Sequence, residues 1–443
     1  MHYNNDYGMP KNKIRDLLIP FITLVIILIA SVSVISYGRG YRLNITQKAI
    51  NPTGLIAATS DPTGAQVLID GNLRTATNNT INVDPGWYTI TIQKEGFQTW
   101  EKRLRVQGEV VTRADAYLFP TNPSLSTLST NGIVNPVLSP DGTKLAYVIP
   151  ESATSTASAN LVRRAGIWIF DLAERPLGLN RDARQIVKNG IADFSDTVLT
   201  WSPDSEQILA AVAHPITKSV SYYLLESGRL NESPRLVTDI AALVSDWEIM
   251  TAQRETELLT GMPGVLAETI KTNMQILSFA PDETKILYQA SVSATLPDII
   301  VPALIGSNSI EQQRKIENGS VYVYDIKEDR NYLIGTDSDL GLIPEPTPTI
   351  ARRQPAAVSP VRFRTYVRPL PVQWLPTSRH LLLLTKERIE AMDYDATNRK
   401  TIYAGPFWDG FMVPWMNASR VLILTTLNPA AGTPPNLYAV NLR

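Results

Sequence analysis

The sequence predicts a mainly β protein with one N-terminal transmembrane helix, a small β-sandwich and a β-propeller of about five blades that carries helical and proline-rich loop insertions. Three observations support this prediction. An apolar run occupies Leu17 to Tyr37, apolar and polar residues alternate from Leu55 to Phe119, and a Pro-Asp hairpin motif recurs from Leu138 onward. The expected boundaries are 1–16 for a cytoplasmic tail, 17–37 for the helix, 38–54 for a connector, 55–120 for the sandwich and 121–443 for the propeller.

The composition argues against several classes of protein. Lys and Arg number 41 against 42 Asp and Glu, so no overall field attracts nucleic acid. There is no cysteine, which rules out disulfides, thiolate metal sites and a cysteine nucleophile. The three histidines are not accompanied by a Gly-x-Ser-x-Gly elbow, a Walker motif or a Gly-x-Gly-x-x-Gly loop. We therefore expect no catalytic residues, no cofactor, no metal site and no nucleic-acid partner.

The apolar run from Leu17 to Tyr37 is long enough to span a bilayer as a helix, which needs about 20 residues. The alternative is a cleaved signal peptide, for which Ala30 to Ser33 is a weak cleavage site. Basic residues flank the run: Lys11, Lys13 and Arg15 precede it, and Arg39 and Arg42 follow it. The first group favours a cytoplasmic N-terminus and the second weakens the asymmetry. We expect a single-pass cell-membrane protein with most of the chain extracytoplasmic.

The alternation from Leu55 to Phe119 has period two, which is typical of strands with one buried face. Turn signals at Asp70-Gly71 and Asp84-Pro85-Gly86 divide it, so we expect a small antiparallel domain. Three segments resemble the PEGA domain, a compact sandwich of bacterial and archaeal surface proteins: Ser60 to Gly71, Pro85 to Ile90, and Lys94 to Phe97 with Trp100. Arg74 to Thr80 departs from the family's Gly-x-Thr-Pro element. The resemblance implies a role in surface attachment and spacing rather than catalysis.

The propeller prediction starts from Leu138 to Val148, where a Pro-Asp-Gly turn joins two short apolar strands. Further copies of this hairpin occupy Leu199 to Val212 and Leu277 to Gln289, and degenerate copies without the Asp occupy Gln373 to Leu384 and Val413 to Leu424. Third strands are expected at Ile167 to Leu172, Tyr222 to Leu225, Val321 to Ile326, Ile389 to Tyr394 and Leu437 to Leu442. Outer strands are expected at Arg184 to Lys188, Arg235 to Thr238, Asn331 to Gly335 and Lys400 to Ala404.

The fifth repeat has no outer strand before Arg443, whereas Ser124 to Thr130 has the outer-strand pattern. A propeller closes its ring when an early strand completes the last blade, so five repeats and five outer strands are then accounted for. The main alternative is a ring of about six or seven blades that includes degenerate repeats. The hairpins and the following Val-Tyr-Val-Tyr-Asp strands resemble TolB-like and WD40-like propeller repeats, which implies a binding scaffold.

Loop lengths indicate where a ligand binds. In a four-stranded blade, the second-to-third connection and the connection to the next blade lie at one end, and here they hold nearly all the insertions. Asp246 to Thr272 reads helical, with Ser245 as N-cap and a break at Gly261 to Gly264. It is expected to be either a lid or partner helix, or a helix packed on the propeller. The Asp residues of the turns, Asp141, Asp204 and Asp282, are expected to cap their own turns rather than to bind metal.

Two further insertions supply the predicted partner-binding residues. Pro344 to Pro371 is rich in proline and arginine, and either stays a solvated loop or captures an anionic partner. Gly405 to Phe411 places aromatic residues beside a carboxylate, as a sugar or peptide platform would, unless they are buried between blades. The predicted residues are Arg352, Arg353, Arg362, Arg364, Phe407, Trp408 and Asp409.

The sequence therefore predicts a membrane-anchored extracytoplasmic binding or scaffold protein. In this interpretation a PEGA-like spacer presents the propeller to a glycan, peptide or protein of the cell envelope. The alternative is a carbohydrate-active envelope enzyme that uses carboxylates on the propeller face. An enzyme requires carboxyl groups that converge in one pocket with perturbed pKa values, and a scaffold does not.

Overall fold

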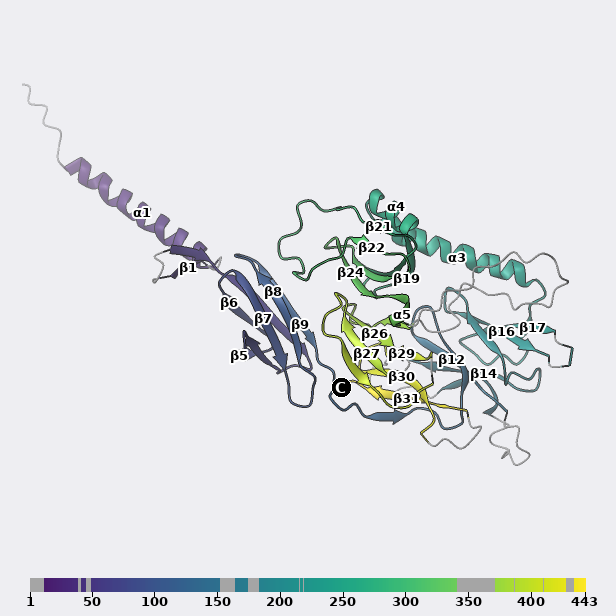
Figure 1. Cartoon of the computed structure of the whole chain (residues 1–443). Coiled ribbons are helices and arrows are strands. Elements are labelled where there is room, and N and C mark those ends of the chain that lie inside the picture. Colours follow the sequence, from purple (N-terminus) through teal and green to yellow (C-terminus); the bar gives the residue numbers. More distant parts are fainter. Residues whose placement is uncertain are drawn as a thin grey trace, which may run out of the picture. The chain divides into compact units, whose positions relative to one another are not determined.

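The structure is a computed structural model that describes residues 12–38, 41–44, 49–151, 164–173, 183–214, 216–217, 219–340, 371–385, 387–408, 410–427 and 434–443 (Figure 1). The chain divides into two compact units, which are described separately below. The first unit comprises Met1–Lys94, Thr99–Tyr117 and Ile305–Ser309, and the second comprises Glu95–Gln98, Leu118–Leu304 and Ile310–Arg443.

The first unit begins with α1 (Asn12–Gly38), a helix of 27 residues. Its stretch Leu18–Ser36 has a mean hydropathy of 2.9 and no buried part, so its length and composition suffice to cross a membrane. A signal sequence near the N-terminus has the same properties. Inside the helix, the Thr23 hydroxyl donates to the backbone carbonyl oxygen of Ile19 (3.0 Å), so its hydrogen-bonding capacity is met within the helix. The antiparallel hairpin of β1 (Tyr41–Asn44) and β2 (Ala49–Pro52) follows.

Two packed sheets form the rest of the first unit. One sheet has the order β6-β3-β9 and the other the order β5-β4-β7-β8. Alternate residues of β3 are buried, as the period-two pattern predicts, and Ile56, Val67 and Ile90 are completely buried. The strands are β3 (Gly54–Asp61), β4 (Gln66–Ile69), β5 (Asn72–Ala76), β6 (Asn79–Val83), β7 (Gly86–Gln93), β8 (Trp100–Val106) and β9 (Val111–Tyr117).

The expectation of a purely antiparallel domain is wrong at one position. β9 pairs with β3 in parallel, with Leu55 opposite Val111 and Asp61 opposite Tyr117. Parallel and antiparallel strands share the same two-residue side-chain period, so the sequence pattern does not reveal this direction. The chain changes sheets between β5 and β6, where the family's Gly-x-Thr-Pro element is missing. There the buried Thr77 accepts the Ala65 N–H (3.1 Å) and hydrogen-bonds the Ser60 hydroxyl (2.7 Å), which fixes the corner.

The second unit is a β-propeller of five four-stranded antiparallel sheets in its described residues, which confirms the predicted fold class (Figure 1). Blades 1 to 4 each use four consecutive main strands. Blade 1 contains β11 (Val134–Leu138), β12 (Lys144–Ile149), β13 (Gly166–Asp171) and β14 (Arg184–Lys188), and blade 2 contains β15 (Val198–Trp201), β16 (Gln207–Ala213), β17 (Val220–Glu226) and β18 (Arg235–Leu236). Blade 3 contains β19 (Met274–Phe279), β20 (Lys285–Ala290), β23 (Val321–Asp325) and β24 (Arg330–Gly335), and blade 4 contains β25 (Val372–Trp374), β26 (His380–Leu384), β27 (Ile389–Asp393) and β28 (Lys400–Tyr403).

Blade 5 closes the ring with a strand from the start of the domain, as predicted. It contains β29 (Met412–Pro414), β30 (Arg420–Thr425), β31 (Asn436–Asn441) and, as its outer strand, β10 (Leu125–Thr127). β10 pairs with β31 so that Ser126 lies opposite Ala439. The Asn441 side-chain amide adds hydrogen bonds to the hydroxyls of Ser124 (2.9 Å) and Ser126 (2.8 Å). The last blade therefore has no open edge at β31.

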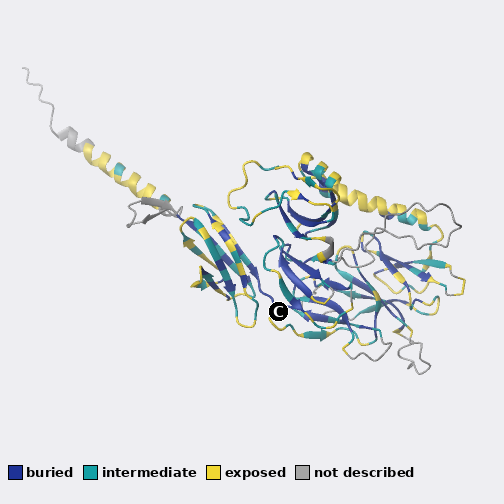
Figure 2. Cartoon of the chain, viewed as in Figure 1, coloured by how far each residue is buried: buried dark blue, intermediate teal, exposed yellow. Residues whose placement is uncertain are grey.

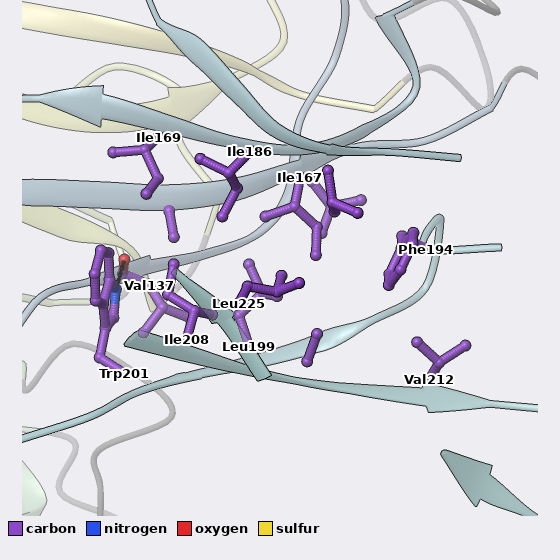
Figure 3. Packing of buried hydrophobic residues seen from close by; sticks show 14 residues of the cluster. Val137, Ile167, Ile169, Ile186, Phe194, Leu199, Trp201, Ile208, Val212 and Leu225 are labelled. Carbon is purple, nitrogen blue, oxygen red and sulfur yellow. Dashed lines mark hydrogen bonds between the residues drawn. The ribbon is translucent and has the colours of Figure 1, made fainter. Parts of the chain in front are cut away.

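Neighbouring blades pack through apolar side chains that alternate along each strand. Figure 3 shows the cluster between blades 1 and 2, in which Ile167 and Ile169 of β13 face Ile208 of β16 and Leu225 of β17. The indole N–H of Trp201 donates to the Val137 carbonyl oxygen (3.0 Å) and ties the two inner strands together. Equivalent clusters join blade 3 to blade 4 and blade 5 to blade 1.

Two helices are inserted between blades 2 and 3, where the sequence predicts a broken helix. The break between them contains Gly261 and Pro263, as expected. The predicted N-cap, Ser245, is wrong: the helix begins six residues earlier, because the Asp239 carboxylate accepts the Ala242 N–H (3.0 Å) and caps it. The elements inserted in the propeller are α3 (Ile240–Thr260), α4 (Gly264–Asn273), β21 (Ala294–Thr295), β22 (Lys315–Ile316) and the short α5 (Asp337–Leu340).

Candidate binding face

The strand order places the long connections at one end of the ring. The turns between the first and second strands of the blades occupy 139–143, 202–206, 280–284, 375–379 and 415–419, at the opposite end. The connection from blade 2 to blade 3 spans 237–273, the one between β20 and β23 spans 291–320, and the one from blade 4 to blade 5 spans 404–411. We call the end with these long connections the insertion face. Loops held on a rigid ring are where binding residues are commonly found.

Most of the predicted partner-binding residues lie outside the described residues. Arg352, Arg353, Arg362, Arg364 and Asp409 belong to this group. Phe407 and Trp408 are described, and both lie on the insertion face between β28 and β29. The structure therefore describes two of the seven predicted residues.

The segment that carries Phe407 and Trp408 is fixed to the ends of neighbouring strands. The Pro406 carbonyl oxygen accepts the hydroxyls of Thr425 (2.6 Å) and Tyr403 (3.2 Å). The Trp408 N–H donates to the Leu424 carbonyl oxygen (2.6 Å). Phe407 is partly buried and packs near the Tyr403 ring, with 6.3 Å between the ring centroids. Burial raises the pKa of the Tyr403 phenol, so its hydroxyl stays protonated and keeps donating to this turn.

Trp408 itself remains 55% exposed. An indole on a backbone held at three points loses little freedom when a flat apolar surface stacks on it. Sugar rings and aromatic or prolyl peptide groups offer such surfaces. The sequence left two alternatives for this segment, a binding platform or burial between blades. Phe407 packs inward, as burial requires, whereas Trp408 stays available to a partner.

The helical insertion bridges two blades that share no described apolar cluster. Trp247 of α3 packs with Leu209 and Leu224 of blade 2. At the other end of the helix, Leu259 packs with Ile286 and other residues of blade 3. Between these ends, every residue from Glu248 to Glu257 is exposed, and Figure 2 shows α3 exposed along most of its length. The helix packs on the propeller through apolar side chains at both ends, and its solvent-exposed middle contacts blade 3 through the ion pair of Arg254 with Glu283 (2.7 Å).

A second insertion, between β20 and β23, was not singled out by the sequence analysis. Ile299 to Ile305 contains seven successive apolar residues, and Val301 and Leu304 are 78% and 46% exposed. The signal that could have found this segment is an uninterrupted apolar run between Asp298 and Gly306, in a position where the blade pattern requires a loop.

Carboxylates of the hairpin turns serve the turns themselves, as predicted. Asp141 accepts the Thr143 N–H (3.0 Å), and Asp282 accepts the Thr284 N–H (3.1 Å). Burial alone would raise the pKa of Asp141, but hydrogen bonds from Ser139 and Thr143 outweigh it and lower the pKa. Where a carboxyl pKa shift is resolved in the described part of the chain, it is downward in every case: Asp141, Asp193, Asp282, Asp329 and Asp339. No group of three or more acidic or histidine side chains in the described ranges is suited to a metal ion.

A cleft of about 340 Å³ with charged residues in its lining lies at the opposite end, between blades 1 and 2. Its cations are already paired. Arg184 contacts Asp171 (2.7 Å), and the Lys144 amine donates to the Ser205 carbonyl oxygen (3.0 Å) and lies 3.8 Å from Glu206. The two positive and two negative side chains cancel, so the cleft offers no net charge to a ligand.

Within the described ranges, these observations define an N-terminal apolar helix, a two-sheet sandwich and a propeller of five blades with one elaborated face. The sequence profile of the PEGA domain matches residues 53–122, so the chain carries a PEGA domain. No curated protein sequence matches the chain.

Solved structures that are similar to the chain include TolB proteins and another propeller. The putative TolB from Agrobacterium tumefaciens is 13% identical over 70% of this chain and 72% of that chain, with a TM-score of 0.20. TolB from Acinetobacter baumannii is 11% identical over 80% of this chain and 59% of that chain, with a TM-score of 0.20. The β-propeller domain of the Trilobed protease from Pyrococcus furiosus is 12% identical over 88% of this chain and 96% of that chain, with a TM-score of 0.21. Similarity of this extent supports no inference, so the propeller assignment rests on the strand pairing of this chain. The PEGA domain and the apolar helix fit an envelope-associated protein.

Proposed function

We propose that this protein is a membrane-anchored extracytoplasmic binding or scaffold protein, in which the PEGA domain is a spacer and the insertion face of the propeller recognises a glycan, a peptide or an envelope protein. The observation that supports this best is the anchored, exposed Trp408 on the one end of the ring where the insertions gather. A rigid ring with elaborated loops on one end is a suitable support for binding residues.

The chemistry of the partner follows from the residues that the proposal assigns to this face. Arginine forks grip carboxylates or phosphates in two places, and an indole stacks on a sugar or peptide plane. Arg352, Arg353, Arg362 and Arg364 together with Trp408 and Asp409 therefore suit an acidic glycan or an acidic peptide segment. Among the residues that the structure describes, the resolved carboxyl pKa shifts are downward, whereas a general acid of a carbohydrate-active enzyme needs a raised pKa.

Binding arrays test this proposal. The full-length protein in detergent is applied to glycan and acidic-peptide arrays, and positive signals are titrated with wild type and variants. Trp408→Ala should weaken binding about tenfold or more, as the loss of a central aromatic contact does. Trp87→Ala is the matched control, because Trp87 is 49% exposed but belongs to the PEGA unit.

Replacement of the four arginines by serine should weaken binding and flatten its salt dependence, because screened charge pairs would no longer contribute. Unchanged affinity in both the Trp408 variant and the arginine variant, with the fold intact by circular dichroism, would remove the insertion face from the proposal.

A further inference from the structure

The insertion between β20 and β23 ends in an apolar tip that the proposed recognition of a glycan or peptide does not use. Ile299 to Ile305 contains no charged, polar or aromatic residue. Ile299 lies at the edge of the apolar cluster of blade 3, so the base of the loop is part of the core. We call the four residues Val301 to Leu304, all of which are exposed, the apolar tip.

A buried ion pair fixes the base of this loop. One carboxylate oxygen of Asp329 accepts the backbone N–H groups of Ile299 (2.7 Å) and Ile300 (2.9 Å). The other oxygen accepts the Tyr324 hydroxyl (2.5 Å) and pairs with Arg314 (2.9 Å). Arg314 also donates to the Pro297 carbonyl oxygen (3.0 Å), so both strands of the loop are tied to the same pair.

This construction differs from that of an ordinary solvated loop. Single exposed aliphatic side chains are common on protein surfaces and need no explanation. A continuous apolar segment that the fold holds in water is uncommon, and such segments mark contact with a protein or a membrane. Asp329 is 4% exposed, and the N–H groups of Ile299 and Ile300 together with Arg314 compensate for the desolvation of its carboxylate. These contacts hold the base of the apolar tip in one place.

We propose that the apolar tip, Val301 to Leu304, inserts into the outer layer of the lipid bilayer in which α1 of the same chain is anchored. This inference rests on the membrane anchoring in the proposed function. A chain tethered to a bilayer by the 19-residue span Leu18–Ser36 keeps its propeller at high local concentration near lipid, so a small apolar contact is sufficient. The tip offers no hydrogen-bonding or charged side chain for directional recognition, which fits lipid better than a specific protein groove.

The absence of cysteine makes the insertion depth directly measurable, because a single introduced cysteine carries the only label. The full chain with Leu304→Cys is labelled with a nitroxide and reconstituted in phosphatidylcholine vesicles. Collision of the nitroxide with oxygen reports lipid, and collision with a water-soluble nickel chelate reports water. Ile216→Cys is the aqueous control, because Ile216 is 93% exposed in another propeller connection at the same end. Leu28→Cys, in the middle of α1, is the lipid control.

The expected result is an oxygen-to-nickel ratio at position 304 that is several-fold higher than at position 216 and close to that at position 28. The ratio should be unchanged at high salt, because insertion of an uncharged tip needs no charge pairing. Adding Val301→Ser should lower the ratio at position 304. Val292→Ser is the matched control, since Val292 is 43% exposed but lies outside the tip, and it should have no effect.

Three other results would overturn the inference, and each has a distinct meaning. A nitroxide in lipid at position 28 and in water at position 304 would leave the anchor intact and reject the membrane contact of the tip. A nitroxide at position 304 that is shielded from both oxygen and nickel would indicate a protein contact instead. A nitroxide in water at position 28 would reject the membrane anchor and, with it, the insertion of the tip.

Discussion

The five hairpin turns of the propeller each place one residue in the left-handed region of backbone space. The same turn geometry recurs in each, with the N–H of this residue bonded to the carbonyl three residues earlier. These residues are Gly142 (φ 70°), Ser205 (φ 62°), Glu283 (φ 57°), Ser378 (φ 58°) and Ala418 (φ 58°). Only the first is a glycine, so four blades accept the cost of a side chain in this conformation. In three of them the side chain makes a hydrogen bond: Ser205 and Ser378 to a neighbouring blade, and Glu283 to Arg254 of α3.

Ser378 and Ser205 hydrogen-bond to the preceding blade. The Ser378 hydroxyl oxygen accepts the Asp282 N–H (3.0 Å), and Ser205 accepts the Asp141 N–H in the same way (3.1 Å). Ser378→Ala should lower the free energy of unfolding by about 1 kcal/mol, because it removes the acceptor of a partly buried N–H. Urea titration of the full chain measures the change. Ala418→Gly is the control and should change the free energy of unfolding by less than about 0.5 kcal/mol, since relief of the left-handed strain offsets the loss of a buried methyl group.

Asp329 gives the propeller a pH-dependent contribution to stability. Burial by itself would raise the pKa of this carboxyl, but hydrogen bonds from Tyr324, Ile300 and Ile299 and from Arg314 lower it below its usual range. A carboxyl group whose pKa is lower in the folded than in the unfolded state stabilises the fold at pH values above its unfolded pKa of about 3.9. This stabilisation is lost as the pH falls through the folded-state pKa.

Asp329→Asn should therefore lower the free energy of unfolding by about 2 kcal/mol at neutral pH, because the partly buried Arg314 then keeps only the exposed Asp298 (3.1 Å) as a charged partner. Asparagine tolerates the left-handed backbone at this position (φ 52°), so the effect reports the charge. Unfolding titrations at neutral pH and at about pH 3 measure the difference between variant and wild type, which should shrink in acid. A difference that is independent of pH would contradict this account.

At the scale of elements, α3 takes the place of direct packing between blades 2 and 3. Ile208 of β16 faces blade 1, whereas the next residue, Leu209, faces Trp247 of the helix. In blade 3, Leu287 faces blade 4, whereas Ile286 faces the cluster that contains Leu259. The turn of blade 3 is also tied to the helix, because Glu283 accepts from Arg254 (2.7 Å). The helix thus acts as a strut between the two blades.

Truncation of the helix side chain that packs on blade 2 tests this role. Trp247 is 6% exposed, so Trp247→Ala should destabilise the propeller by about 3 kcal/mol or more and speed hydrogen exchange in β16 and β17. Ile249→Ala, two residues away and 53% exposed, should change stability by less than about 0.5 kcal/mol. Equal effects of the two substitutions would show that α3 is not a strut.

The closing strand β10 supports a prediction at the same scale. Deletion of Leu125 to Thr127 leaves the edge of β31 unpaired and should cost more than about 3 kcal/mol, together with a tendency to aggregate. Deletion of the two exposed residues of β18, Arg235–Leu236, is the control and should cost less, because that strand covers only part of β17. Thermal melting and light scattering measure both effects. Similar losses from the two deletions would contradict ring closure by β10.

At the scale of the whole molecule, features that local turn residues determine were predictable from the sequence. Features that depend on packing between distant elements were not. Three Pro-Asp turns and two degenerate copies of the same hairpin predicted all five inner hairpins, and the outer-strand pattern of Ser124 to Thr130 predicted the closure of the ring. The start of α3 was misplaced because Asp239 and Ser245 are both good N-cap residues, and only packing of the first turn on blade 2 selects the former. The parallel pairing of β9 depends on a partner more than 50 residues away.

Of the seven residues predicted for the candidate site, the structure describes Phe407 and Trp408, and their role in binding stays a prediction. Trp408 lies on the insertion face as expected, whereas the inward packing of Phe407 depends on Tyr403 and on the end of β30. The apolar tip was overlooked because a short apolar run in a sequence reads equally well as a buried strand, and only the blade register shows that it is a loop.

The orientation of the chain in the membrane is the broadest prediction and decides whether the proposed function holds. Lys11, Lys13 and Arg15 precede the apolar span, so the positive-inside rule places the N-terminus in the cytoplasm and the propeller outside. With a tag fused before Met1, protease added to intact cells should digest the propeller and spare the tag. Replacement of Lys11, Lys13 and Arg15 by glutamine should weaken this preference, since Arg39 and Arg42 then hold the larger positive charge.

The size of the tagged protein before protease treatment separates the two readings of α1. An uncleaved anchor keeps the tag on a chain of full length, whereas a signal peptide releases it with a short fragment. Release of the tag would show that α1 is a cleaved signal peptide and that the mature protein is secreted or attached in another way. The apolar tip would then have no tether to the bilayer. A propeller that is protected on intact cells but digested after lysis would place the insertion face on the cytoplasmic side and reject an extracellular glycan as its partner.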